Sequence, residues 1–133
     1  ASEINVKIKM QNDNAKFKKR LYSWALRLIK FINKLPKNFV CGIIKKQLLR
    51  NNASILANYI EVNPASSKKD FINFFTHFLK SANESKIWLA LPRDTNKRDQ
   101  QELKWLMNEL LEIVNINNIK YFYIKRKEKI FYF

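Results

Sequence analysis

The sequence is short of the residues that carry covalent, metal or catalytic chemistry. It has 133 residues but one cysteine, Cys41, one histidine, His77, and one glycine, Gly42. One cysteine cannot form a disulfide within the chain, and a single Cys and His are too few for the common zinc sites. A lone glycine also excludes the glycine-rich loops that bind phosphates in nucleotide-binding enzymes. We therefore predict no catalytic residues, no metal and no cofactor.

Long apolar segments are also missing. No apolar run approaches the roughly 20 residues that a membrane-spanning helix needs. Residues 1–10 lack the apolar core of a secretory signal peptide. We expect a soluble protein of the cytoplasm, folded as one domain and long enough to bury a core without disulfides.

Acidic residues are scarce. The chain has 11 Asp and Glu against 26 Lys and Arg, which gives a formal net charge of +15 and a pI of about 10.0. This balance favours polyanionic partners, namely RNA, DNA or an anionic membrane surface. Most of the basic residues are lysine, and Lys, Asn, Ile and Phe are all abundant, as in proteins encoded by AT-rich genomes. A compositional origin of the charge therefore stays open.

Three prolines, Pro36, Pro64 and Pro92, divide the chain into four pieces of similar length. Within each piece apolar residues recur at spacings of three and four, which is the pattern of an amphipathic helix. We predict helices over residues 14–35, 38–61, 67–91 and 99–116. Because the connections are short, the sequence predicts an all-α, antiparallel up-down-up-down four-helix bundle.

The helix ends and the chain ends carry separate signals. Ser67 and Asp70 have the spacing of a capping box at the start of the third helix. Residues 4–10 alternate apolar and polar side chains, a strand-like period. Residues 119–133 could extend the fourth helix, form a hairpin around residues 125–128, or cover a neighbouring subunit. We therefore divide the chain into an N-terminal extension (1–13), the bundle (14–118) and a basic, aromatic C-terminal segment (119–133).

Basic residues gather in three clusters, which are the candidate nucleic-acid-binding residues: Lys16, Lys18, Lys19 and Arg20; Lys45, Lys46 and Arg50; and Lys125, Arg126 and Lys127. Aromatic residues flank the third cluster. Cations interleaved with aromatics suit single-stranded nucleic acid, whose bases stack while its phosphates pair with the cations. The alternative is that the lysines are solvated helix faces and the aromatics pack at an interface.

Ser54, Asn58 and Glu61 lie on one face of the predicted second helix, at spacings of four and three. We interpret them as a buried structural polar network that fixes the helix register and closes the turn into the third helix. A small ligand or metal site and a contact with a neighbouring subunit are the alternatives. An enzyme that uses Asn58, Glu61 and Glu84 is a weaker hypothesis. A nucleophile made of Cys41 and His77 has no support in their spacing.

Several segments together resemble a known family. These are "SILANYIE" (54–61), "SKKDF" (67–71), "SANESKIWL" (81–89) and, in the first helix, "RLYSWALRLIKFINKLP" (20–36). Their order and spacing resemble the bacterial four-helix-bundle proteins first named for the intervening sequences of large-subunit ribosomal RNA genes. The resemblance covers about residues 17–116, with matching residues Ser54, Ala57, Asn58, Glu61, Asp70, Phe71 and Glu84.

The resemblance implies a four-helix bundle that assembles into a homo-oligomer, usually a ring of five, with no known enzyme activity. A distant relative is the accessory protein of diversity-generating retroelements, a basic ring associated with a reverse transcriptase and nucleic acid. We therefore expect a non-catalytic accessory or scaffold protein that contacts RNA or DNA through basic helix faces. The alternative is a structural oligomer that binds a protein partner, such as a reverse transcriptase, without touching nucleic acid.

Overall fold

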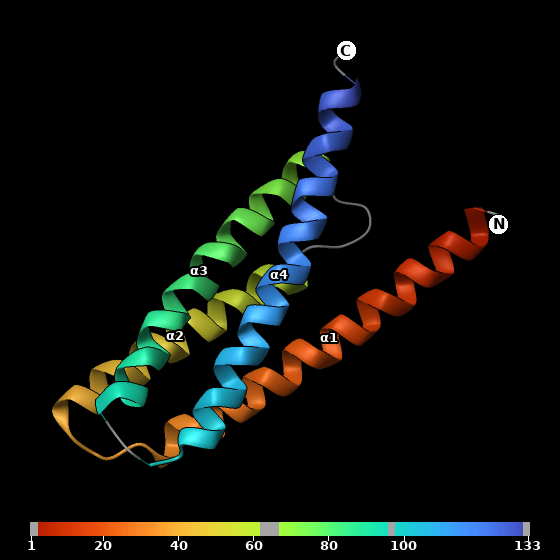
Figure 1. The fold of residues 1–133 in the computed structure, drawn as a ribbon. Helices are drawn as coiled ribbons and strands as arrows, with labels where there is room; N and C mark the ends of the chain where they lie inside the picture. Colours follow the sequence, from red (N-terminus) through yellow and green to blue (C-terminus); the bar gives the residue numbers. More distant parts are fainter. Residues whose placement is uncertain (1–2, 62–66, 96–97, 132–133) are drawn as a thin grey trace.

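The chain forms four long helices. In the computed structural model these are α1 (Glu3–Lys34), α2 (Phe39–Glu61), α3 (Lys68–Thr95) and α4 (Gln100–Phe131). The structure describes the backbone of residues 3–61, 67–95 and 98–131, and the side chains of residues 15–59, 67–95 and 98–118 and of Asn5; these ranges hold no strand. Each helix packs against the next along the chain, and α4 packs back against α1 (Figure 1).

Contacts between the helices fix their directions. Arg20 pairs with Glu109 while Arg27, further along α1, pairs with Glu102, which lies earlier on α4. The same opposition links α2 and α3, since Ser54 meets Ser81 and the earlier Arg50 meets the later Glu84. Both pairs of helices are therefore antiparallel. The predicted all-α four-helix bundle is confirmed.

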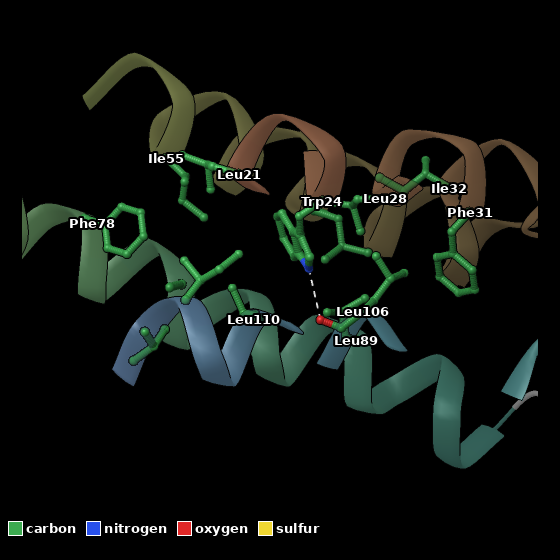
Figure 2. Packing of buried hydrophobic residues seen from close by; sticks show 14 of the residues in the cluster. Leu21, Trp24, Leu28, Phe31, Ile32, Ile55, Phe78, Leu89, Leu106 and Leu110 are labelled. Atoms are coloured by element: carbon green, nitrogen blue, oxygen red, sulfur yellow. Dashed lines mark hydrogen bonds between the residues drawn. The ribbon is translucent and has the colours of Figure 1, made fainter. Parts of the chain in front are cut away.

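The core is built from the apolar stripe of each helix (Figure 2). Trp24 of α1 is fully buried, and its indole N–H donates a hydrogen bond to the carbonyl oxygen of Leu106 on α4 at 2.9 Å. This bond satisfies the one polar group that the indole takes into the core. Around Trp24 the helices contribute aliphatic and aromatic side chains, among them Leu21, Leu28, Leu48, Ile55, Phe78, Leu89, Leu106, Leu110 and Ile113.

Aromatic rings join three helices at one end of this core. Tyr59 of α2 lies between Phe17 of α1 and Phe74 of α3, with ring centroids 5.1 and 5.9 Å away. Phe71 meets Phe75 edge to face at 4.5 Å. Burial raises the pKa of the Tyr59 hydroxyl to about 12, because the apolar surroundings disfavour its phenolate form. Tyr59 is thus part of the packing that joins α1 to α3.

Side chains at the helix ends satisfy backbone groups. The amide of Cys41 donates to the Asn38 side-chain oxygen at 2.8 Å, which caps the start of α2. The amide of Asp70 donates to Ser67 Oγ at 3.2 Å, so the predicted serine cap of α3 is present. At the other end of α3, the Gln100 side chain donates to the Arg93 carbonyl at 3.0 Å.

Helix lengths differ from the sequence predictions at three places. The alternating pattern over residues 4–10 suggested a strand, and this is wrong, because these residues belong to α1, which begins at Glu3. A lone strand has no neighbour for its backbone groups, whereas a helix pairs them internally. Helix α3 continues past Pro92 to Thr95, with Pro92 in its last turns. Residues 119–131 extend α4, the first of the three alternatives for that segment.

Candidate functional site

The first basic cluster lies on α1 and separates into two kinds of residue. Lys16, Lys18 and Lys19 are exposed. Arg20 instead turns toward α4, where it pairs with Glu109 and Glu112. The hydrogen bond with Glu109 raises the pKa of the Arg20 guanidinium, although partial burial opposes the shift. The three lysines keep their charges in solvent, while the charge of Arg20 is compensated inside the protein.

A second arginine on α1, which the sequence analysis did not single out, is held in the same way. Arg27 makes a two-point contact with Glu102 of α4, at 2.9 and 2.7 Å, and its guanidinium carbon lies 3.4 Å from the centre of the Trp105 ring. The hydrogen bond from Arg27 holds the pKa of the Glu102 carboxyl below its usual value. Arg20 and Arg27 are seven residues apart, as are Glu102 and Glu109, and this spacing places each pair on one face of its helix. The shared spacing is the feature of the sequence from which the pairing of Arg27 with Glu102 could have been predicted.

The second basic cluster lies on α2. Lys46 is exposed and Lys45 is half-buried. Arg50 pairs with Glu84 of α3 at 3.1 Å and also donates to Gln47 at 3.1 Å. The arginines of the first two clusters thus face different neighbours, α4 and α3, so the structure does not bring the clusters together on one face.

The third basic cluster lies outside the described side chains. Lys125, Arg126 and Lys127 belong to the last turns of α4, where the structure describes the backbone alone. Their role stays a prediction.

The polar face of α2 forms a chain of hydrogen bonds that reaches α3. Asn58 Nδ2 donates to Ser54 Oγ at 3.2 Å, and Ser81 Oγ of α3 donates to the same oxygen at 3.1 Å. The buried Ser85 continues the chain by donating to the Ser81 carbonyl at 3.0 Å. The side chain of Glu61, the last residue of α2, lies outside the described residues. For Ser54 and Asn58 the arrangement is that of an interhelical polar network, to which Ser81 and Ser85 are additions.

The candidate catalytic pair of Cys41 and His77 is far apart along the helices. The contacts of Ser54 with Ser81 and of Arg50 with Glu84 set the register of α2 against α3. In this register Cys41 and His77 are separated by about 24 Å along the bundle, at 1.5 Å per residue. His77 is exposed. Cys41 and His77 are therefore not brought into one site.

A hollow lies at the end of the bundle where α1 finishes and α4 begins. It has a volume of about 630 Å³ and is lined by Arg27, Lys30, Phe31 and Lys34 of α1 and by residues 99–102. Since Arg27 and Glu102 neutralise each other, the remaining lining charges are two lysines against Asp99. The sequence alone does not predict this hollow, because its shape depends on how α1 and α4 meet.

Metal-binding groups and membrane spans were also sought in the described ranges. No three His, Cys, Asp or Glu side chains there lie close enough together to hold a metal ion. Within the same ranges, no helix combines the length and the apolar character needed to cross a membrane.

Comparisons with known proteins complete the description. Residues 13–118 match the family described as 23S rRNA-intervening sequence proteins. Among solved structures, a protein of unknown function from the S23 ribosomal protein family of Bacteroides thetaiotaomicron is 30% identical, with a TM-score of 0.69. The match covers 79% of this chain and 97% of that one. A comparison with curated proteins gave no match. The chain therefore belongs to the 23S rRNA-intervening sequence protein family, whose model matches most of its length.

Proposed function

We propose that this protein is a non-catalytic, oligomeric accessory protein of the cytoplasm that binds RNA or DNA through exposed lysines. One observation carries the proposal: in the described ranges the ion pairs between side chains use arginine, while most of the lysines are exposed. Every ion pair that joins two described side chains has an arginine as its cation. The exposed lysines of α1 and α2, namely Lys16, Lys18, Lys19, Lys30, Lys34 and Lys46, therefore keep their charges available to an outside partner.

Lysine suits contact with the phosphate backbone more than recognition of base sequence. Its ammonium group is a compact point charge, whereas bidentate readout of bases favours the planar guanidinium of arginine. Binding through such lysines depends on the release of counterions and weakens steeply with salt. We expect affinity for nucleic acid in general, with little preference for sequence.

The oligomeric part of the proposal is supported by an apolar patch. Exposed side chains at the start of α2 are Phe39, Val40 and Ile43, and near the end of α3 they are Ile87 and Leu91. The antiparallel register of α2 and α3 places these two groups toward the same end of the bundle, with Ile43 and Leu91 at about the same level. Exposed apolar patches of this kind mark contacts with other proteins.

The patch also favours the second candidate function, a structural oligomer that binds a protein partner without nucleic-acid contact. The two functions differ in what the lysines do. In the second, their removal leaves partner binding unchanged, and removal of the patch abolishes it.

The test is a binding titration of the full chain with structured RNA, single-stranded DNA and duplex DNA across a salt series, with the mass of the protein measured alongside. We expect micromolar or tighter binding at low salt, and a log-log salt slope of several units. A measured mass equal to that of a single chain would contradict the oligomeric part of the proposal. No binding at low salt would overturn the nucleic-acid function and leave the protein-partner function in its place.

A further inference from the structure

The outer surface of α1 carries a line of exposed side chains that the core does not explain. Lys18, Tyr22, Leu26, Lys30 and Lys34 follow one another at intervals of four residues, and all five are exposed. Residues four apart are neighbours on a helix surface, so these side chains form one continuous line, which we call the α1 ridge. It is about 24 Å long at 1.5 Å per residue. Its far end reaches the hollow lined by Lys30 and Lys34.

Tyr22 is the distinctive member of the α1 ridge. Its side chain is 61% exposed, although the other aromatic residues of α1 in the described range, Phe17, Trp24 and Phe31, are buried. Lys18 and Lys19 precede it by four and three residues, and both are exposed. An aromatic ring in solvent with two cations beside it offers a face for a nucleobase and charges for the adjoining phosphates.

We infer that the α1 ridge binds single-stranded nucleic acid, with Tyr22 stacking on one base and the lysines on either side of it contacting the backbone. The inference rests on the proposed nucleic-acid function and names its substrate class. Stacking on a side chain requires a base whose face is free. In a duplex the faces are covered by neighbouring base pairs, so Tyr22 has no stacking partner there.

The other basic cluster with described side chains lacks this combination. Arg50 is occupied by Glu84 and Gln47, and Lys45 is half-buried. Phe39 at the start of α2 is even more exposed than Tyr22, at 84%, but the residues three and four positions along the helix are Gly42 and Ile43 rather than lysines. Because Phe39 belongs to the apolar patch, the control is Leu111→Ala, which removes an exposed apolar side chain of α4 outside both the ridge and the patch.

The experiment compares Tyr22→Ala, Tyr22→Phe and Leu111→Ala in the full chain, using a single-stranded oligonucleotide and a duplex of the same sequence. Base stacking on an aromatic side chain is worth roughly a 5- to 150-fold change in affinity. We expect Tyr22→Ala to lose that factor on the single strand and to keep its duplex affinity. Tyr22→Phe, which retains the ring, and Leu111→Ala should both bind as the unmodified protein does.

A charge comparison tests the backbone contacts. Lys18→Gln with Lys30→Gln removes two charges from the ridge, and Lys69→Gln with Lys80→Gln removes two exposed charges from α3. Each phosphate contact on a single strand adds about 0.7 to the log-log salt slope. The ridge variant should lose about 1.4 from that slope, and the α3 variant should lose little.

The outcomes distinguish a failure of the proposed nucleic-acid function from a failure of the ridge inference. If the unmodified protein binds no nucleic acid, the proposed function fails, and the ridge fails with it. If it binds but Tyr22→Ala retains full affinity for the single strand, the ridge inference alone is overturned. An equal loss on single strand and duplex would also overturn it, because stacking could not then be the cause.

Discussion

Among the described residues, ion pairs join α1 to α4 and α2 to α3. These two faces of the bundle are held by different chemistry. On the α1–α4 face, long side chains reach across: Arg20 to Glu109 and Glu112, and Arg27 to Glu102. On the α2–α3 face, hydroxyl groups meet directly, with Ser54 and Ser81 separated by 3.1 Å. Serine side chains are short, so this contact requires the two helix backbones to approach closely.

The difference shows how each face limits what the protein can do with its charge. On the α1–α4 face, two arginines of α1 are paired with acidic residues of α4. The described lysines of the same helix are exposed. Among its described side chains the α2–α3 face has one ion pair, between Arg50 and Glu84, beside small polar groups and apolar packing. On α1 the described arginines thus pair with acidic residues while the described lysines stay exposed, and charged residues are fewer on α2.

The largest expected effect tests the role of Trp24 in docking α1 onto α4. Trp24→Ala should lower the free energy of unfolding by about 3–5 kcal/mol, since a large buried side chain is lost and a cavity remains. Trp24→Phe should cost less, because only the hydrogen bond to Leu106 and part of the ring are removed. Urea unfolding followed by circular dichroism measures both. A cost for Trp24→Ala below 1 kcal/mol would mean that α1 is not anchored by this residue.

The helices themselves could be predicted from the sequence because each one buries a long apolar stripe. Periods of three and four sustained over several turns have no other common explanation. The chain ends were harder. Over residues 4–10, seven residues of alternation also fit a helix, and only the continuation into the rest of α1 decides between them.

The candidate site could be predicted in part, for a physical reason that Arg20 illustrates. The sequence places Arg20 in a basic cluster, but its partner Glu109 is 89 residues away along the chain. Whether an arginine is free depends on the register between α1 and α4, which no local pattern encodes. The polar network on α2 was easier, because Ser54 and Asn58 are one helical turn apart and meet within the same helix.

A smaller effect is expected at the α2–α3 face. Ser54→Ala and Ser81→Ala should each cost about 1 kcal/mol, because each leaves a hydroxyl partner without its hydrogen bond. The double variant should cost less than the sum, since residues in direct contact couple. A double-mutant cycle in urea measures the coupling. Strictly additive costs would show that the contact between the two hydroxyls contributes nothing to the stability of this face.

The smallest effect, and the one that separates the two faces most sharply, concerns pH at the α1–α4 face. Arg27 lowers the pKa of Glu102 below its usual value of 4.5, so the folded state favours the carboxylate. The stabilisation is therefore present above pH 4.5 and is lost as the pH falls through the lowered pKa. We expect Glu102→Gln to cost about 0.5 kcal/mol at pH 7, the size typical of a partly exposed ion pair, and progressively less as the pH falls through the lowered pKa.

The measurement is the free energy of unfolding of Glu102→Gln and of the unmodified protein between pH 7 and pH 3. Ser81→Ala serves as the control, because neither Ser54 nor Ser81 titrates in this range and its cost should not change with pH. If the cost of Glu102→Gln were also constant, the pair with Arg27 would hold α1 to α4 through shape and hydrogen bonding rather than through charge. The two faces would then differ only in the length of the side chains that join them.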